Sequence, residues 1–343
     1  MKLLQQNKKN STVILGASGS FGANMSVELS ARGDKLKLVT RSPQKLPNVV
    51  KKNRLVEIEP DIDVLDTTSL RKIFHGADTV IFGLNRPYPE WDPFMPHALE
   101  ATIKAALAQE TAPRIVFPGN VYALGPSRGT PFDENTVNAP STKKGYIRDK
   151  LENMLREASQ KYGLKVLIVR GTDFFGPSVR NGFVDRIFGN IAEGKPADIF
   201  GLGEVPHQFT YVPDFAKATA DLLMLESLGN FEIVNAPFIT ELSIKNLVAI
   251  AAEKIGKPDL SVRSTPWGIV SLIGIFSPLL REMVEMKYLF ETQIRLDTSK
   301  FTTLVPDFKP TSLEKAITET LRSYGAPVVT NQPSTTRTLE KVW

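Results

Sequence analysis

A glycine-rich turn near the start of the chain restricts the fold more than any other feature of the sequence. An apolar run at residues 13–15 leads into Gly16, Gly19 and Gly22, and a segment of helical character follows at 23–31. Glycine at these positions permits a tight turn, a close approach of the backbone to a phosphate, and close packing of helix on strand. Amide groups at the helix N-terminus then face the phosphate oxygens. We therefore predict a strand, turn and helix that bind a dinucleotide.

Short apolar runs alternate with helical segments through the first half of the chain. The expected strands are 12–15, 36–40, 55–58, 79–82, 114–117 and 166–169. This alternation predicts right-handed crossovers and a parallel sheet covered on both faces. Beyond Gly171, Pro and Gly are frequent, and helices are expected at 217–228, 243–255 and 313–323. We predict a doubly wound α/β domain at 11–170, completed by later segments, and a substrate lobe at 171–325.

The composition restricts the chemistry and the partners. The chain has no cysteine, which excludes thiolate catalysis and cysteine zinc sites, and its three histidines lack metal-type spacing, so no metal is expected. The net charge is +5, but the basic residues are scattered, so we expect no nucleic acid. Residues 1–10 lack the apolar stretch of a signal peptide, which favours a disordered lead on a cytoplasmic protein. Residues 326–343 are expected to form a C-terminal tail.

The most apolar stretch of the chain lies at residues 265–280. It is interrupted by Gly268, Gly274 and Pro278, and its sixteen residues are too few to span a bilayer comfortably. We expect a buried helix or the wall of a substrate pocket, and no stable membrane insertion.

Ordered motifs extend over most of the chain. The turn GASGSFG (16–22) is followed by Asp63-Val64, by VIFGLN (80–85), by IVRGTDFFGP (168–177) and by FTYVPDFAKA (209–218). Over about residues 11–325 they resemble the extended short-chain dehydrogenase/reductases, the NAD-dependent epimerase/dehydratase family. The chain is identified as an atypical member, because its catalytic segment departs from the family pattern.

The resemblance implies a Rossmann-type doubly wound parallel sheet with a small C-terminal substrate lobe. It also implies a nicotinamide cofactor and a small-molecule substrate. The implied cofactor contacts are Gly16, Ser18, Gly19, Ser20, Phe21, Gly22, Asp63, Val64, Gly83, Leu84 and Asn85.

The end of the second strand bears on the choice of cofactor. An acid at this place accepts from the ribose 2′-hydroxyl of NAD. This chain has Thr40, Arg41 and Ser42 there, and Lys45 slightly further on. Because a guanidinium offers a planar fork of donors to a 2′-phosphate, we favour NADP, with Arg41 as its ligand. NAD stays open, since Arg41 could instead stack on the adenine or lie in solvent.

Two helical registers compete for the catalytic pair. The resemblance implies a Tyr-x-x-x-Lys pair, and Tyr146 and Lys150 have this spacing. The apolar stripe of the same helix, compared with the family's, instead places the pair at Lys144 and Arg148. The two registers lie about 200° apart around the helix and exclude one another. The stripe consists of Ile147, Leu151, Met154, Leu155 and Ala158.

The remaining site residues also depart from the family pattern. Where the family has serines, this chain has Pro118 and Gly119, so we expect Asn120 and Tyr122 to contact the substrate. His207, on the expected substrate loop, is a further candidate. Lys144 could act as an acid if burial and Arg148 lowered its pKa toward neutrality. Alternatively, the residues at 144, 148 and 152 form a solvated helix face of i,i+4 pairs.

We therefore expect an NAD(P)-dependent oxidoreductase or epimerase/dehydratase that acts on a carbonyl or secondary alcohol of a small molecule. The alternative is a non-catalytic NADP-binding protein with a regulatory or redox-sensing role, because function belongs to the site rather than to the fold. The oligomeric state stays open, with a homodimer as one alternative.

Overall fold

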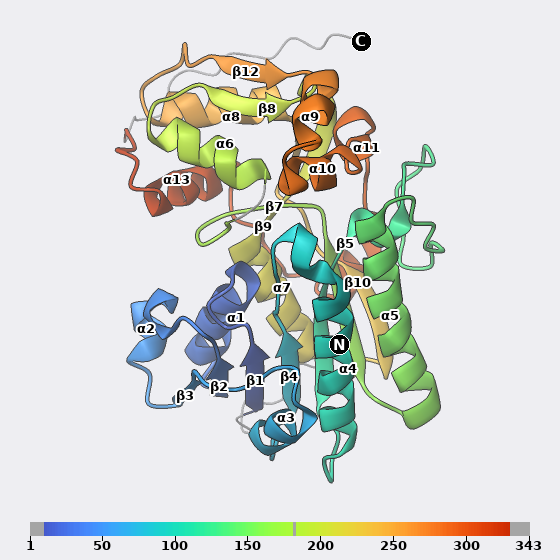
Figure 1. Ribbon diagram of the computed structural model, residues 1–343. Helices are drawn as coiled ribbons and strands as arrows, with labels where there is room; N and C mark the ends of the chain where they lie inside the picture. The colour runs from blue at the N-terminus through green and yellow to red at the C-terminus, as the bar shows by residue number, and fades with distance from the viewer. Residues whose placement is uncertain (1–9, 181–182, 330–343) are drawn as a thin grey trace.

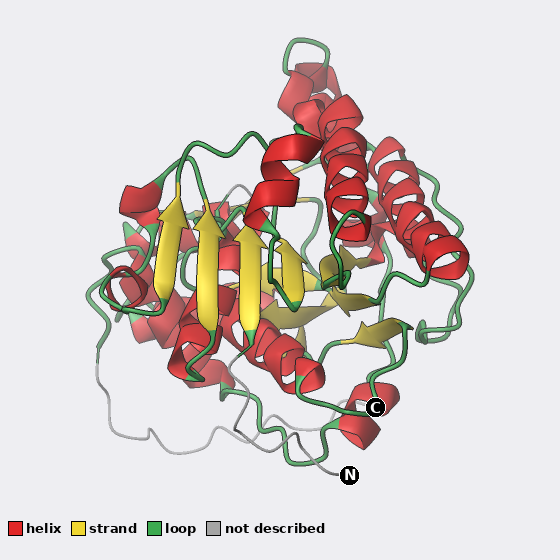
Figure 2. Ribbon diagram, turned by 90° about the horizontal axis from the view of Figure 1, so that it is seen from below, coloured by secondary structure: helices red, strands yellow, loops and turns green. Residues whose placement is uncertain are grey.

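The computed structural model describes residues 10–180 and 183–329, so most of the expected lead and tail lie outside the described residues. Its central sheet has seven parallel strands in the order β10-β6-β5-β4-β1-β2-β3. The strands are β1 (Ser11–Leu15), β2 (Lys35–Val39), β3 (Val56–Glu59), β4 (Thr79–Phe82), β5 (Arg114–Asn120), β6 (Val166–Gly171) and β10 (Phe231–Asn235). The predicted doubly wound fold and its first six strands are confirmed (Figure 2).

Helices cover both faces of the sheet, because the strands are apolar on both sides. One face is covered by α1 (Ser20–Ala31) and α7 (Val212–Leu223), which pack against each other. The other is covered by α3 (Thr67–Ile73), α4 (Trp91–Leu107) and α5 (Lys143–Tyr162). Short elements connect these: η1 (Pro43–Lys45), α2 (Asn48–Lys51), η2 (Tyr88–Glu90), η3 (Val121–Leu124) and α12 (Ser299–Leu304).

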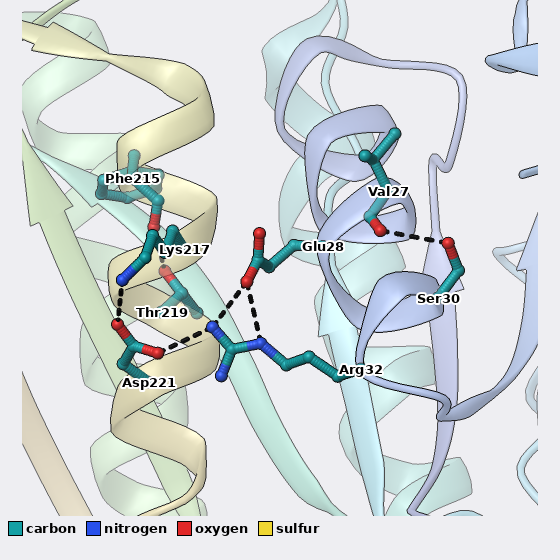
Figure 3. Close-up of polar contacts among 8 residues, drawn as sticks. All are labelled: Val27, Glu28, Ser30, Arg32, Phe215, Lys217, Thr219 and Asp221. Carbon is teal, nitrogen blue, oxygen red and sulfur yellow. Dashed lines mark hydrogen bonds and ion pairs between the residues drawn. The ribbon is translucent and has the colours of Figure 1, made fainter. Parts of the chain in front are cut away.

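An ion-pair network joins α1 to α7, although the two helices are far apart in sequence (Figure 3). Arg32, directly after α1, donates to Glu28 of α1 and to Asp221 of α7, the latter at 2.7 Å. Lys217 donates to the other carboxylate oxygen of Asp221 at 2.8 Å. The helix that follows the glycine turn is therefore held by a segment that comes almost two hundred positions later.

A second lobe lies beyond the carboxyl ends of the central strands (Figure 1). Its sheets are β11-β9-β7 and β12-β8, formed by β7 (Asp173–Phe175), β8 (Ala197–Phe200), β9 (Pro206–Tyr211), β11 (Thr240–Ser243) and β12 (Val262–Thr265). Its helices are α6 (Phe183–Ala192), α8 (Ile244–Lys254), α9 (Trp267–Gly274), α10 (Pro278–Val284), α11 (Tyr288–Glu291) and α13 (Leu313–Ser323). The chain returns from this lobe to supply α7 and β10 to the central domain.

The apolar stretch at 265–280 forms α9 and the start of α10, and the expectation of a buried helix or pocket wall is wrong for most of it. Trp267 and Val270 are buried, but six large apolar side chains are between 46% and 86% exposed. These six are Ile269, Leu272, Ile273, Ile275, Phe276 and Leu279. Among the described residues, no helix combines the length and the apolar character needed to cross a membrane.

Candidate functional site: a dinucleotide cradle beside a buried basic pair

The glycine turn packs against the carboxyl end of β4, where backbone atoms leave no room for a side chain. Gly16 has a φ of +75°, and a Cβ there would lie 2.6 Å from the Gly83 carbonyl oxygen. A Cβ on Gly22 would lie 2.4 Å from the Gly16 carbonyl oxygen. No side chain caps the N-terminus of α1, and its first turn has no acid. The amides at this helix end are therefore arranged to receive an anion.

We predict that alanine at two of these glycines has different effects. Gly22→Ala should lower the free energy of unfolding by about 1–3 kcal/mol, because its Cβ meets backbone that cannot yield. At Gly19, the nearest atom to an added Cβ is the Gly16 oxygen at 3.2 Å, so Gly19→Ala should fold. It should nevertheless weaken dinucleotide binding roughly tenfold or more, because the added methyl points to where the phosphates approach.

Urea denaturation and fluorescence titration with NADPH measure the two effects. Gly268→Ala is the control, because nothing lies within 4 Å of a Cβ at that position. Normal NADPH binding by Gly19→Ala would contradict the placement of the phosphates.

The glycine turn at residues 16–22 and the N-terminus of α1 form a cradle for the dinucleotide phosphates. The other predicted cofactor residues surround this cradle. Thr40 donates to Ser18 at 2.6 Å, which ties the end of β2 to the turn. Arg41 is exposed and has no hydrogen bond or ion pair within the described residues. Phe21 packs edge-to-face on Phe215 of α7, with ring centroids 5.2 Å apart. The outer edge of the cradle therefore presents an unengaged cation, while its inner edge is packed.

The residues after β3 and β4 close the other side. Asp63 is exposed and accepts from the Leu65 amide at 2.9 Å, and Val64 packs against the core. Asn85 accepts from the indole N–H of Trp91 at 3.1 Å, which connects the end of β4 to the beginning of α4.

The phase of α5 separates the two candidate catalytic pairs. Lys144 is 1% exposed, whereas Tyr146 is 61% exposed and Lys150 also faces solvent. Thr142 caps the helix by accepting from the Gly145 amide at 3.1 Å. Lys144 and Arg148 therefore face the protein interior, and Tyr146 and Lys150 lie on the outer side of the helix.

Lys144 is held by two carboxylates from the second lobe. Its ammonium donates to Glu282 of α10 and to Glu285 just beyond that helix. Glu285 also accepts from the Lys143 amide at 2.9 Å, in the first turn of α5. Lys144 therefore forms an ion pair that joins α5 to the second lobe. The alternative of a solvated helix face is wrong, because Lys144 is buried and paired across the lobes.

Arg148 lies among aromatic rings. Its guanidinium is 4.6 Å from the ring centroid of Trp91 and 5.5 Å from that of Phe117, and it donates to the Pro118 carbonyl at 3.2 Å. Burial lowers the pKa of Arg148 from its ordinary value. Its Nε is buried with no partner among the described residues. A buried cation with an unused donor is suited to an incoming anionic or polar group.

Tyrosines border the basic pair. The hydroxyls of Tyr88 and Tyr122 are 2.9 Å apart, and burial raises the pKa of both. Burial also raises the pKa of Tyr288, whose hydroxyl is buried without a partner in the described part of the chain. Near neutral pH all three phenols therefore carry their protons.

The predicted substrate residues are placed around these tyrosines. The Asn120 side chain accepts from the Tyr122 amide at 3.1 Å and so caps η3. His207 is buried, and its Nδ1 lies 2.7 Å from an Asp173 oxygen. Asp173 acts electrostatically on both Tyr88 and Tyr122. Asn120 therefore has a local structural contact, whereas His207 is linked to the tyrosines through Asp173.

Sequence reasoning missed four residues of this site. Glu282, Glu285 and Tyr288 come from the segment after the apolar stretch, and their approach to α5 depends on how the lobe folds back. Asp173 lies within the motif at residues 168–177. Its carboxylate follows a buried strand, and this position indicates a polar partner such as His207.

Comparison with known proteins identifies the class to which this fold and site belong. Residues 12–236 match the model of the NAD dependent epimerase/dehydratase family, and the chain belongs to this family. The predicted resemblance is therefore confirmed, and it places the chain in a family of NAD-dependent enzymes.

Relatives and solved structures agree with this assignment. The chain is 22% identical to the uncharacterized protein y4nG of Sinorhizobium fredii over 76% of its own length and 64% of that relative. It is 24% identical to an uncharacterized UDP-glucose epimerase, YtcB, of Bacillus subtilis, over 62% and 68%. A dTDP-glucose 4,6-dehydratase of Streptomyces venezuelae, solved with NAD, has the same fold, with a TM-score of 0.77 at 17% identity over 92% and 96%.

Proposed function

We propose that the chain binds NADP and exchanges a hydride with a carbonyl or secondary alcohol of a small molecule. The exchange is either a net oxidation or reduction, or a transient step within an epimerase or dehydratase cycle. The observation that carries this proposal is the glycine turn packed on Gly83, with an uncapped helix N-terminus, inside the region that matches the family. The bound nicotinamide supplies or accepts the hydride.

The chain's own groups then serve the substrate oxygen. The guanidinium of Arg148 stabilises negative charge as it develops on that oxygen. The paired phenols of Tyr88 and Tyr122 hold the proton that the oxygen takes up or gives back. Lys144, held by Glu282 and Glu285, positions the N-terminal turn of α5 and the ring of Tyr88, which lies 5.3 Å from its Nζ.

NADP is the preferred cofactor in this proposal. Arg41 is exposed beside the turn with no carboxylate partner in the described part of the chain, and the Thr40 hydroxyl is bonded to Ser18. Related structures are described with NAD, and the proposed preference for NADP rests on the residues after this chain's own second strand.

We predict that Arg41→Ala weakens NADPH binding by roughly 10- to 100-fold and leaves NADH binding unchanged, because it removes charge-assisted bonds to the 2′-phosphate. Fluorescence titration with both nucleotides measures this. Lys35→Ala is the matched control, since Lys35 is an exposed cation at the other end of β2. Equal losses for both nucleotides would overturn the NADP assignment.

The substrate class is also a proposal. Relatives are named for UDP- and dTDP-sugars, and we propose a sugar nucleotide or another small carbonyl compound in the cytoplasm, with no nucleic acid partner. Incubation of the protein and cofactor with UDP-glucose, UDP-glucuronate, dTDP-glucose and simple ketones, followed at the absorbance of reduced nicotinamide and by product analysis, tests it. The expected result with one of these compounds is net oxidation or reduction of the nicotinamide, or an epimerised or dehydrated product with no net change in the cofactor.

A non-catalytic NADP-binding role is the second candidate. It is favoured by Pro118 and Gly119 at the positions where a polarising hydroxyl is expected, and by the pairing of Lys144 with Glu282 and Glu285. Tight NADPH binding without any hydride exchange across the panel would support this role and overturn the catalytic proposal.

A further inference from the structure

The hairpin formed by α9 and α10 is apolar on two opposite sides. Trp267, Val270 and Gly274 face the core of the lobe and are buried. At 100° per residue, Ile269, Leu272 and Ile273 lie within an arc of about 100° on the other side, and Phe276 follows in the turn that leads to α10. Leu279 continues this surface onto α10, which packs against α9 (Figure 1). A helix that is apolar all round is normally covered on every side.

The exposed fractions show that the outer side has no cover within the described chain. Phe276 is 86% exposed and Leu272 is 63% exposed, and the other four large side chains of the surface are between 46% and 59% exposed. Single exposed apolar residues are ordinary, but six large ones within residues 269–279 of one helical hairpin indicate an interaction surface.

The charges around the hairpin distinguish between possible occupants. Residues 260–281 contain no Asp or Glu, and their charged residues are Arg263 and Arg281. Arg263 pairs with Asp198, which Arg186 also contacts, so these two exposed cations share one carboxylate and an excess of positive charge is left. The next acids, Glu282 and Glu285, point inward to Lys144. Arg281 is exposed and donates to the carbonyls of Gly274 and Ile275 at the turn, which keeps its cation at the edge of the apolar surface.

We propose that this hairpin docks on an anionic lipid surface, with its apolar side inserted among the acyl chains near the headgroups. Apolar side chains combined with flanking cations are the pattern that such surfaces recognise. A two-fold dimer through the same surface would bring the cations of both copies together. In this arrangement the hairpin lies in the plane of the membrane and does not span it. This agrees with the absence of a spanning helix among the described residues.

Flotation with vesicles tests the docking on the full chain. The wild-type protein should float with vesicles of phosphatidylcholine and phosphatidylglycerol, and less with phosphatidylcholine alone or at high salt. Phe276→Ser and Leu272→Ser should each lower the partition coefficient on the order of tenfold, because each removes a large buried apolar group from the bound state. Neither side chain supports the fold, since both are exposed.

Leu202→Ser is the matched control, because Leu202 is 75% exposed but lies outside the hairpin. It should float like the wild type. No flotation of the wild type, or equal losses for Leu202→Ser and Phe276→Ser, would overturn the proposal. A concentration-dependent dimer in light scattering that Phe276→Ser dissociates, without vesicle binding, would assign the surface to a second copy and also overturn it. These outcomes do not depend on NADPH binding or hydride exchange.

Discussion

Replacement of Glu152 by alanine is expected to lower the free energy of unfolding by about 3–5 kcal/mol. Glu152 and Arg170 are both 1% exposed, and a carboxylate oxygen of Glu152 lies 2.5 Å from the Arg170 guanidinium. Asn138 donates to the same carboxylate oxygen at 3.1 Å. Removal of the acid would leave a buried guanidinium without its counter-charge, and this accounts for most of the expected loss. Urea denaturation of purified wild type and variant measures it.

A second glutamate on α5 provides the control. Glu157 pairs with Lys161 one turn away, and both side chains are 59% exposed. Glu157→Ala should change the free energy of unfolding by less than about 1 kcal/mol, because solvent screens an exposed pair. The Glu152–Arg170 pair joins α5 to β6. Similar losses in the two variants would show that this buried pair contributes no more to stability than an exposed pair.

Replacement of Arg148 by methionine is expected to lower kcat by roughly 10²- to 10³-fold with whichever substrate proves active. The change removes the cation that faces the Tyr88–Tyr122 pair and keeps a side chain that can fill space between Trp91 and Phe117. NADPH affinity should change little, because the proposed phosphate contacts lie at the glycine turn. Steady-state kinetics and NADPH titration separate the two effects.

Arg156 is the matched control for this variant. It lies two turns further along α5, and its guanidinium is 4.6 Å from the ring centroid of Phe231. Arg156→Met therefore removes the same kind of cation–ring contact away from the site and should leave kcat unchanged. Tyr146→Phe should also be silent, since Tyr146 is exposed. A loss of kcat in Tyr146→Phe but not in Arg148→Met would restore the Tyr-x-x-x-Lys register.

Local sequence determined the central domain to a large extent. The apolar runs that end at Leu15, Phe82 and Val169 predict buried parallel strands, because strands covered on both faces must be apolar on both sides. The glycine turn is readable for a similar reason, since only glycine tolerates the close backbone contacts at positions 16 and 22. The helical phase of α5 was also readable, because one apolar stripe determines which side of a helix is buried.

Tertiary structure decided the rest of the site. The burial of Lys144 follows from its helix, but its two partners come from a lobe more than 130 positions away. The pairing of His207 with Asp173 likewise depends on strands that meet only in the folded chain. Periodicity predicts the side of a helix that is covered, but it does not identify the segment that covers it.

The apolar hairpin is a second case in which the sequence pattern does not determine which side chains are covered. By itself, the sequence determined that residues 265–280 are apolar and too short to span a bilayer. Only the tertiary structure decided that Val270 is buried while Phe276 faces outward. The physical reason is that hydropathy measures the gain from leaving water, whereas the packing of the whole lobe determines which side chains obtain it.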